Sequence, residues 1–317
     1  MDNLNGYKAF EPGMICKGKQ YQENTDYEEE GGEICEKGMM HYCVNPFDVL
    51  NFYPLVNDSG KVSDFATVKS LEEPVSGDDG KFATKKLHIG VKLGLAGFVN
   101  ACIDYIKEKP IEKAPNSTVS SGNYAQIGSS GYSAQIGSSG NSAQIGSSGY
   151  SAKIGSSGNY AQIGSSGDSA QIGSSGYYAQ IGSSGYSAQI GSSGYYAQIG
   201  SSGDSAQIGS SGNYAQIGSS GDSAKIGSSG YYAKIGSSGD SAQIESSGEY
   251  SVICCSGAAS IVKAKLGSWI TLAEWKYLDE KNRMVPQFVK TEFVDGERIK
   301  ADTWYKLIGG KFTEVSP

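Results

Sequence analysis

The chain has 317 residues, 45 glycines, a formal net charge of −7 and only 38% hydrophobic residues. The acidic balance provides no basic surface for nucleic acid, so we expect no nucleic-acid partner. No apolar stretch approaches the roughly 18 residues of a membrane span, and the first residues lack a positive patch followed by an apolar run. We therefore expect no membrane association and place the protein in a cytoplasm.

Residues 1–113 are expected to form a small α+β domain. Strand-like segments occur at 7–10 and 85–91. Apolar side chains recur at three- and four-residue spacing over 94–106, which predicts an amphipathic helix. We expect this helix to lie over the first coil of the repeat that follows and to act as its cap.

The cysteines are scattered, which favours reduced thiols over a disulfide framework. Cys35, His41 and Cys43, with Cys16 upstream, are residue types that bind metal, but their spacing matches no known zinc motif. We expect them to be structural. No Ser-His-Asp order, phosphate loop or pair of carboxylates is recognisable, so the sequence predicts no enzyme, catalytic residue, cofactor or metal.

A nine-residue unit repeats fifteen times from residue 123 to residue 257. Its Ala and Ile are two positions apart, so both point to one face of a strand while Tyr and Gln point to the other. Each unit therefore predicts a short strand followed by a turn at Gly-Ser-Ser-Gly. We expect its glycines to adopt positive φ.

A longer period lies within the first, because the residue before Ala alternates between Tyr and Ser from Tyr160 onward. The structural repeat is thus 18 residues, or two strands per coil. Coils stacked in parallel at about 4.8 Å predict a mainly β fold, a flattened β-solenoid of seven and a half coils over residues 114–265. We expect tyrosines on one face and serines on the opposite face.

The outward Tyr and Gln ladders are the candidate binding residues, although identical neighbours at strand spacing also stabilise the stack by themselves. A row of rigid tyrosines is typical of protein-interaction sites. We expect binding of a protein partner or self-association into a homo-oligomer. The candidate residues are Tyr160, Tyr178, Tyr196, Tyr214, Tyr232, Tyr250, Gln162, Gln180, Gln198 and Gln216.

Two other binding functions are minor alternatives. An ice-binding surface needs a flat, regular face, but bulky Tyr and flexible Gln order water poorly. A calcium-binding β-roll also packs two nine-residue units per coil, yet Tyr or Ser occupies its aspartate position here. The aspartates present lie one position earlier and are expected to be solvated corner carboxylates; they are Asp168, Asp204, Asp222 and Asp240.

The segment 266–317 is expected to be a β-meander that caps the last coil. Residues 269–275, 287–294, 304–308 and 312–315 are strand-like, and Asp295-Gly296 is typical of a hairpin turn. Without a cap, the last coil would expose unpaired backbone groups and promote end-to-end polymerisation.

The chain resembles a family of nonapeptide-repeat proteins carried by bacteriophages and prophages. The resemblance rests on Tyr7-Lys8-Ala9-Phe10, on the segments 16–21, 35–43 and 46–54, and on 264–274 after the repeat. It implies an N-terminal domain, a β-solenoid and a C-terminal cap in a host cytoplasm, but no activity. We therefore expect a non-enzymatic solenoid that binds a host or defence protein.

An enzyme is the alternative hypothesis. The strand and helix-like segment over 38–53 faintly resemble the strand and helix that follow the nicotinamide pocket in ADP-ribosyltransferase folds. In that case the N-terminal domain would bind a nucleotide and the solenoid would be its scaffold.

Overall fold

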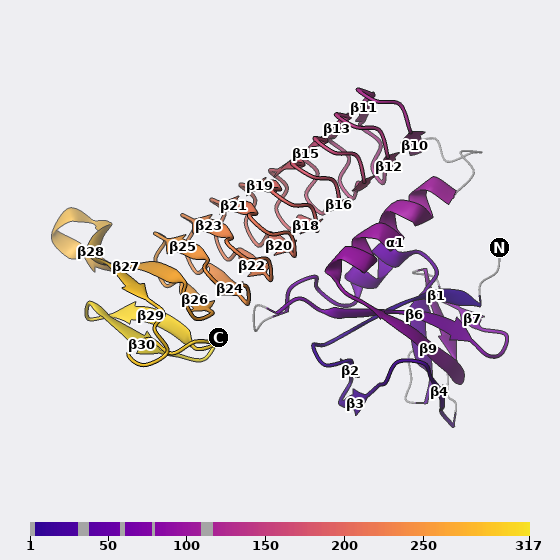
Figure 1. Cartoon of the computed structure of the whole chain (residues 1–317), viewed down its shortest axis with the longest axis horizontal. Coiled ribbons are helices and arrows are strands. Elements are labelled where there is room, and N and C mark those ends of the chain that lie inside the picture. The colour runs from indigo at the N-terminus through magenta and orange to yellow at the C-terminus, as the bar shows by residue number, and fades with distance from the viewer. Residues whose placement is uncertain (1–3, 31–37, 58–60, 78–79, 109–116) are drawn as a thin grey trace.

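The computed structural model describes residues 4–30, 38–57, 61–77, 80–108 and 117–317 (Figure 1). Cys35 and the predicted domain boundary at 113/114 lie outside the described residues. The described chain is mainly β and consists of a sheet-rich N-terminal region, a parallel β-solenoid and a C-terminal strand region.

The N-terminal region contains a seven-stranded antiparallel sheet in the order β4-β9-β6-β1-β5-β8-β7. A short hairpin of β2 and β3 packs near one face of the sheet. The strands are β1 (Asn5–Phe10), β2 (Ile15–Cys16), β3 (Lys19–Gln20), β4 (Thr25–Glu28), β5 (Met40–Cys43), β6 (Asp64–Ser70), β7 (Val75–Ser76), β8 (Lys81–Thr84) and β9 (Lys86–Leu93).

Two helices cover the other face of this sheet. The helix α1 spans Leu95–Glu108, and η1 (Pro46–Asn51) is a 3-10 helix whose first turn is capped by the Asn45 side chain. The rings of Phe65 and Phe98 stack with centroids 3.8 Å apart, which joins α1 to β6.

The solenoid has nine coils and two parallel sheets. We call the sheet that faces α1 the covered sheet and the other the open sheet. The covered sheet contains β10 (Ser117–Ser120), β12 (Gln135–Ser138), β14 (Lys153–Ser156), β16 (Gln171–Ser174), β18 (Gln189–Ser192), β20 (Gln207–Ser210), β22 (Lys225–Ser228), β24 (Gln243–Ser246) and β26 (Ile261–Ala264). The open sheet contains β11 (Gln126–Ser129), β13 (Gln144–Ser147), β15 (Gln162–Ser165), β17 (Gln180–Ser183), β19 (Gln198–Ser201), β21 (Gln216–Ser219), β23 (Lys234–Ser237), β25 (Val252–Cys255) and β27 (Trp269–Leu278).

The 18-residue period is confirmed by the strand register. Ile163 pairs with Ile181, and every consensus strand repeats this step. The count of seven and a half coils was too low, because units outside the consensus continue both ladders. Ser117–Ser120 pairs in register with β12 at one end, and Ile261–Ala264 pairs with β24 at the other.

The strand interior contains one residue more than expected. Ala188, Ile190 and Ser192 are all fully buried, so a serine joins Ala and Ile inside each coil. The reason is that the four-residue strand runs from Gln through Gly to this serine, and alternate side chains point inward. Gln and the first Gly point outward.

The expectation that the repeat glycines adopt positive φ was wrong. The left-handed residues at the corners are instead tyrosines and serines, such as Tyr196 (φ 58°) and Ser205 (φ 57°). The corner glycines serve close packing between coils: a Cβ on Gly203 would lie 1.8 Å from the carbonyl oxygen of Gly185. The predicted Tyr and Ser faces are therefore two rows of corner residues.

The C-terminal region consists of two hairpins rather than one meander. β28 (Arg283–Phe293) pairs with β27 and extends the open sheet, while β29 (Trp304–Ile308) and β30 (Lys311–Glu314) extend the covered sheet. The turn at Asp295-Gly296 links the two sheets, and the β27-β28 hairpin turns at η2 (Asp279–Lys281) instead.

Candidate functional site

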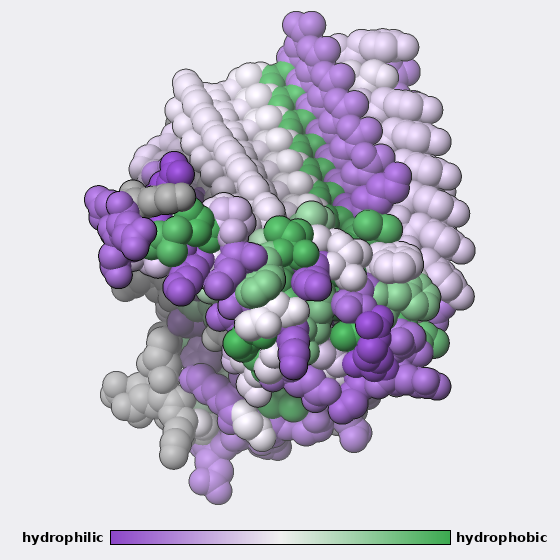
Figure 2. Space-filling model, turned by 90° about the vertical axis from the view of Figure 1, so that its left-hand side faces the viewer, coloured by the Kyte–Doolittle hydropathy of each residue, from purple (hydrophilic) through white to green (hydrophobic). Residues whose placement is uncertain are grey.

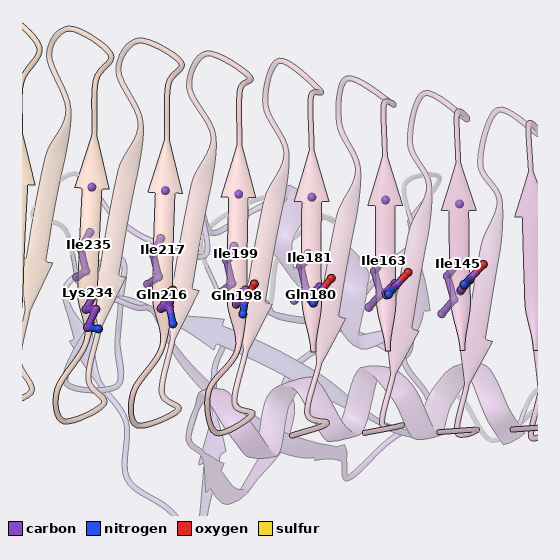
Figure 3. A pocket seen from close by; sticks show the side chains of 18 of the residues that line it. Ile145, Ile163, Gln180, Ile181, Gln198, Ile199, Gln216, Ile217, Lys234 and Ile235 are labelled. Carbon is purple, nitrogen blue, oxygen red and sulfur yellow. The ribbon is translucent and has the colours of Figure 1, made fainter. Parts of the chain in front are cut away.

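A shallow groove of about 1210 Å³ runs along the open sheet. It crosses the strands from β11 to β25, so seven coil steps of about 4.8 Å make it about 34 Å long. The coils from β11 to β21 each contribute an outward Gln, a deeper Ile and an outward Gly, as at Gln180, Ile181 and Gly182 (Figure 3). Lys234 replaces this Gln on β23, and Val252 and Cys254 replace the Gln and the Gly on β25. Figure 2 shows the result as a continuous hydrophobic band beside a hydrophilic column.

The glycine column makes the floor of this groove accessible. We call this column of glycines the open trough. It consists of Gly128, Gly146, Gly164, Gly182, Gly200, Gly218 and Gly236. A Cβ added at any of them would meet no atom within 4 Å. A partner can therefore approach the backbone of the open sheet closely from β11 to β23.

The candidate residues predicted from the sequence lie together on this side of the solenoid. Gln162, Gln180, Gln198 and Gln216 are exposed and line the groove. The predicted tyrosines occupy the adjacent corner, and Tyr160 to Tyr250 stack in steps with ring centroids 4.9 to 5.5 Å apart.

The tyrosine stack differs from the interaction surface we expected. Each ring lies nearly parallel to the next, with 5° between Tyr178 and Tyr196. The ring faces inside the stack are therefore covered by neighbouring rings, so a partner meets ring edges and hydroxyl groups. The tyrosines form a rim beside the groove and not a flat aromatic platform.

The covered sheet carries the same Gln-Ile-Gly-Ser sequence, and its glycine column is occupied. A Cβ on Gly191 would lie 3.2 Å from Val99 Cγ2 and 3.6 Å from Leu95 Cδ1, and one on Gly173 would lie 3.4 Å from Val99 Cγ1. α1 thus lies along the coils in this trough. The helix was expected to cap the first coil, but the trough of a sheet buries its apolar stripe more completely than a coil end.

The Gln column of the covered sheet receives polar groups from the same domain. Gln207 Oε1 accepts a hydrogen bond from Val56 N (3.3 Å), and Gln171 Nε2 donates to Asn51 Oδ1 (3.5 Å). Lys153, which replaces Gln in this column, pairs with Asp48. Aliphatic side chains in the trough and polar groups on the Gln column together hold the two regions in contact.

The corner aspartates fasten one coil to the next. Asp204 Oδ1 accepts a hydrogen bond from Asp222 N (2.9 Å), and Asp222 Oδ1 accepts one from Asp240 N (2.7 Å). Asn123, Asn141 and Asn159 make the same contact at other corners. Throughout the described ranges, no group of three or more His, Cys, Asp and Glu side chains is placed to hold a metal.

Cys16, His41 and Cys43 come together around a second cavity, of about 290 Å³, in the N-terminal region. Cys43 is buried, and Cys16 is half-buried and forms no disulfide. Lys8 and Tyr53 line the same cavity, and nothing in the sequence pattern identified them as neighbours of Cys16.

The comparisons with known proteins concern the N-terminal region alone. Residues 4–101 match the family model described as Domain of unknown function (DUF7666). No curated protein and no solved structure matches the chain. None of the helices in the described part of the chain has the length and apolar character needed to cross a membrane.

Proposed function

We propose that the protein is a binding scaffold whose open sheet holds an α-helix of a protein partner along the open trough. The observation that carries this proposal is the occupancy of the equivalent surface. The covered sheet, with the same repeat sequence, already holds α1 against Gly173 and Gly191. A surface of the same composition and spacing on the open sheet has the same capacity.

The dimensions of a helix suit this surface. One helix turn rises about 5.4 Å, near the roughly 4.8 Å between coils, so successive turns meet successive glycines. The 14 residues of α1 extend about 21 Å, and the open trough accommodates a longer helix. Because glycine has no side chain, the helix approaches the sheet backbone closely and buries its aliphatic stripe.

The partner helix should present aliphatic residues four positions apart, as Leu95 and Val99 do in α1. It should carry Asn, Asp or free backbone groups on the side that faces Gln180, Gln198 and Gln216. The tyrosine rim adds hydroxyl donors on the same side of the groove. Given the resemblance to phage-borne repeat proteins, the partner in this proposal is a host protein in the host cytoplasm, and no reaction is assigned to the solenoid.

A binding measurement with the full-length protein tests the proposal. The ligand is a hydrocarbon-stapled, fluorescent peptide with the sequence of α1, measured by anisotropy. The variant Gly182→Val/Gly200→Val fills the open trough without meeting other atoms at Cβ, so it should fold and lose at least about tenfold in affinity, which corresponds to about 1.4 kcal/mol. Equal binding by the wild type and this variant would refute the proposal.

The ladder variant separates the trough from the tyrosine rim. Replacement of Tyr178, Tyr196, Tyr214 and Tyr232 by Ser should weaken the peptide complex less than filling the trough does, since the rings contribute only edges. Serine occupies the same left-handed position at Ser142, so the backbone tolerates the change. If this variant alone abolished binding, the tyrosine rim and not the trough would be the site.

Self-association is distinguished by sedimentation of the protein without peptide. A dimer that Gly182→Val/Gly200→Val dissociates would identify a second copy as the occupant of the open trough. A monomer that binds the stapled helix would support a separate partner.

A further inference from the structure

The N-terminal cavity opens where two neighbouring strands diverge. β1 and β5 pair only at Tyr7 and Cys43. Next to this pair, the contact between the two strands is made by the Lys8 side chain and not by backbone hydrogen bonds. Lys8 Nζ donates a hydrogen bond to the carbonyl oxygen of His41 (2.8 Å), although only 6% of Lys8 is exposed. A lysine is therefore held inside the sheet, at the wall of a cavity of about 290 Å³.

A thiol lies beside this lysine. Cys16 is on β2, and Tyr53 Oη lies 3.0 Å from its Sγ and donates a hydrogen bond to it. Burial lowers the pKa of Lys8, while hydrogen bonding and attraction to Cys16 act in the opposite direction. The same contact with Cys16, after burial, raises the pKa of Tyr53. The Cys16 sulfur is therefore flanked by a lysine amine and a tyrosine hydroxyl at the wall of the cavity.

The cavity has a cationic wall and an aromatic wall. Lys8, Lys17 and Lys81 line it, and no Asp or Glu is among the described residues that do so. Glu11, whose charge acts on Tyr53, is not part of the lining. Phe52 and Tyr53 supply apolar surface, and Lys81 Nζ lies 4.4 Å from the centre of the Phe52 ring. The composition suits a small organic anion.

We propose that Cys16 is a nucleophilic thiol that exchanges with small anionic disulfides held in this cationic cavity. The Cys16 thiol gives up its proton to water to form a thiolate, and the departing thiolate of the disulfide takes up a proton from water. The thiolate attacks one sulfur of the disulfide, a new S–S bond forms, and the other sulfur leaves as a thiolate with the electron pair of the broken bond. Tyr53 stabilises the attacking sulfur through its hydroxyl, and the lysines hold the anionic groups.

The other described cysteines differ from Cys16, because Cys43 lines the same cavity but is buried and the rest lie elsewhere. Cys43, Cys102 and Cys255 are buried, and burial raises the pKa of the Cys102 and Cys255 thiols. Cys254 is exposed at the far end of the solenoid, away from Lys8, Lys17 and Lys81, with Lys234 on the neighbouring strand. It provides an internal reference for a thiol without a cationic cavity. The site is independent of the proposed binding face.

The test compares two disulfides on the full-length protein, glutathione disulfide as the anionic probe and cystamine as the cationic probe. Adduct formation at Cys16 and Cys254 is followed by peptide mass spectrometry. We expect Cys16 to react at least about tenfold faster than Cys254 with glutathione disulfide, and to lose this advantage with cystamine, because a positive cavity concentrates anions.

Two variants show whether the lysines cause the preference. Lys8→Met should slow the anionic reaction at Cys16 and leave Cys254 unchanged. Lys17→Gln/Lys81→Gln changes two cavity lysines without disturbing the buried amine of Lys8, so it tests the effect of charge alone. It should bring the rate of reaction of Cys16 with glutathione disulfide closer to its rate with cystamine. If Cys16 reacted no faster than Cys254 with glutathione disulfide, or kept its anion preference in both variants, the proposal would be overturned.

Discussion

The glycines of the repeat have two separate functions at the level of single residues. The glycine in the strand leaves the trough open, whereas the corner glycine allows neighbouring coils to touch through their backbones. Both were expected to be turn residues with positive φ. They were assigned to the turn because the sequence Gly-Ser-Ser-Gly is typical of a turn. In the structure, the first glycine and the first serine of this sequence belong to the strand.

Alanine substitutions at two glycines of one unit distinguish these functions. Gly203→Ala places a Cβ 1.8 Å from the carbonyl oxygen of Gly185, so the coils must separate and the protein should lose several kcal/mol of stability or misfold. Gly200→Ala meets no atom and should be neutral or stabilise by about 0.5 kcal/mol, because it restricts the unfolded chain. Urea denaturation of both variants checks the difference; equal stability would contradict the assigned functions.

The serine that points into each coil is a position where another residue should make the protein more stable. The Ser192 hydroxyl is buried and has no hydrogen-bond partner in the structure. The last coils place Cys255 and Ala264 at the equivalent position. Ser192→Ala should therefore raise the unfolding free energy by about 1 kcal/mol. A lower denaturation midpoint than that of the wild type would show that this hydroxyl is satisfied in solution.

At the level of elements, the tyrosine stack contributes to the stability of the open side. Tyr196 stacks on both Tyr178 and Tyr214, with centroids 4.9 Å away in each case. Tyr196→Ser removes two stacked pairs and should cost about 1 to 2 kcal/mol. Tyr186→Ser is the matched control, since Tyr186 is exposed and its neighbours in the row are Asp168 and Asp204. Similar losses in both variants would indicate that stacking adds nothing.

The link between the two C-terminal hairpins should depend on pH. Asp295 Oδ1 accepts hydrogen bonds from the backbone N–H groups of Glu297, Arg298 and Ile299, and these bonds lower the pKa of the Asp295 carboxyl below its usual value of 3.8. A lowered pKa means that the stabilisation is complete above the unfolded-state value and is lost as the pH falls through the folded-state value.

Hydrogen exchange of β29 and β30 measured between neutral and acidic pH checks this dependence. We expect protection to fall in acid in the wild type. In Asp295→Asn it should be lower at neutral pH and nearly independent of pH, because the amide does not titrate. Identical pH profiles for the two proteins would rule out a role for the carboxylate.

The sequence predicted the elements well and their arrangement less well. The alternation of Tyr and Ser gave the coil length, and the spacing of Leu95, Phe98 and Val99 gave the helix, because both depend on local periodicity. The position of α1 on the covered sheet depends on contacts between Val99 and glycines more than 70 residues away, which no local pattern records. For the same reason the Gln ladder was found from the sequence, while the open trough, Lys8 and Tyr53 were not.

At the level of the whole molecule, the two sheets of the solenoid have similar sequences, but a helix covers only one of them. One trough is filled by α1, and the C-terminal hairpins pair with the last strand of each sheet (Figure 1). The other trough is open from β11 to β23. The central claim is that this asymmetry leaves a binding face for a helix.

Cys254 gives the most direct test, because its exposed side chain lines the C-terminal end of the groove. We would measure its alkylation rate by mass spectrometry while adding a stapled helix of about 22 residues, about 33 Å long, that repeats the Leu95/Val99 spacing. The account predicts protection of Cys254 that saturates with helix concentration and is absent in Gly182→Val/Gly200→Val. Saturable binding of the helix with no change in the Cys254 rate would contradict the claim that the open trough is the binding face.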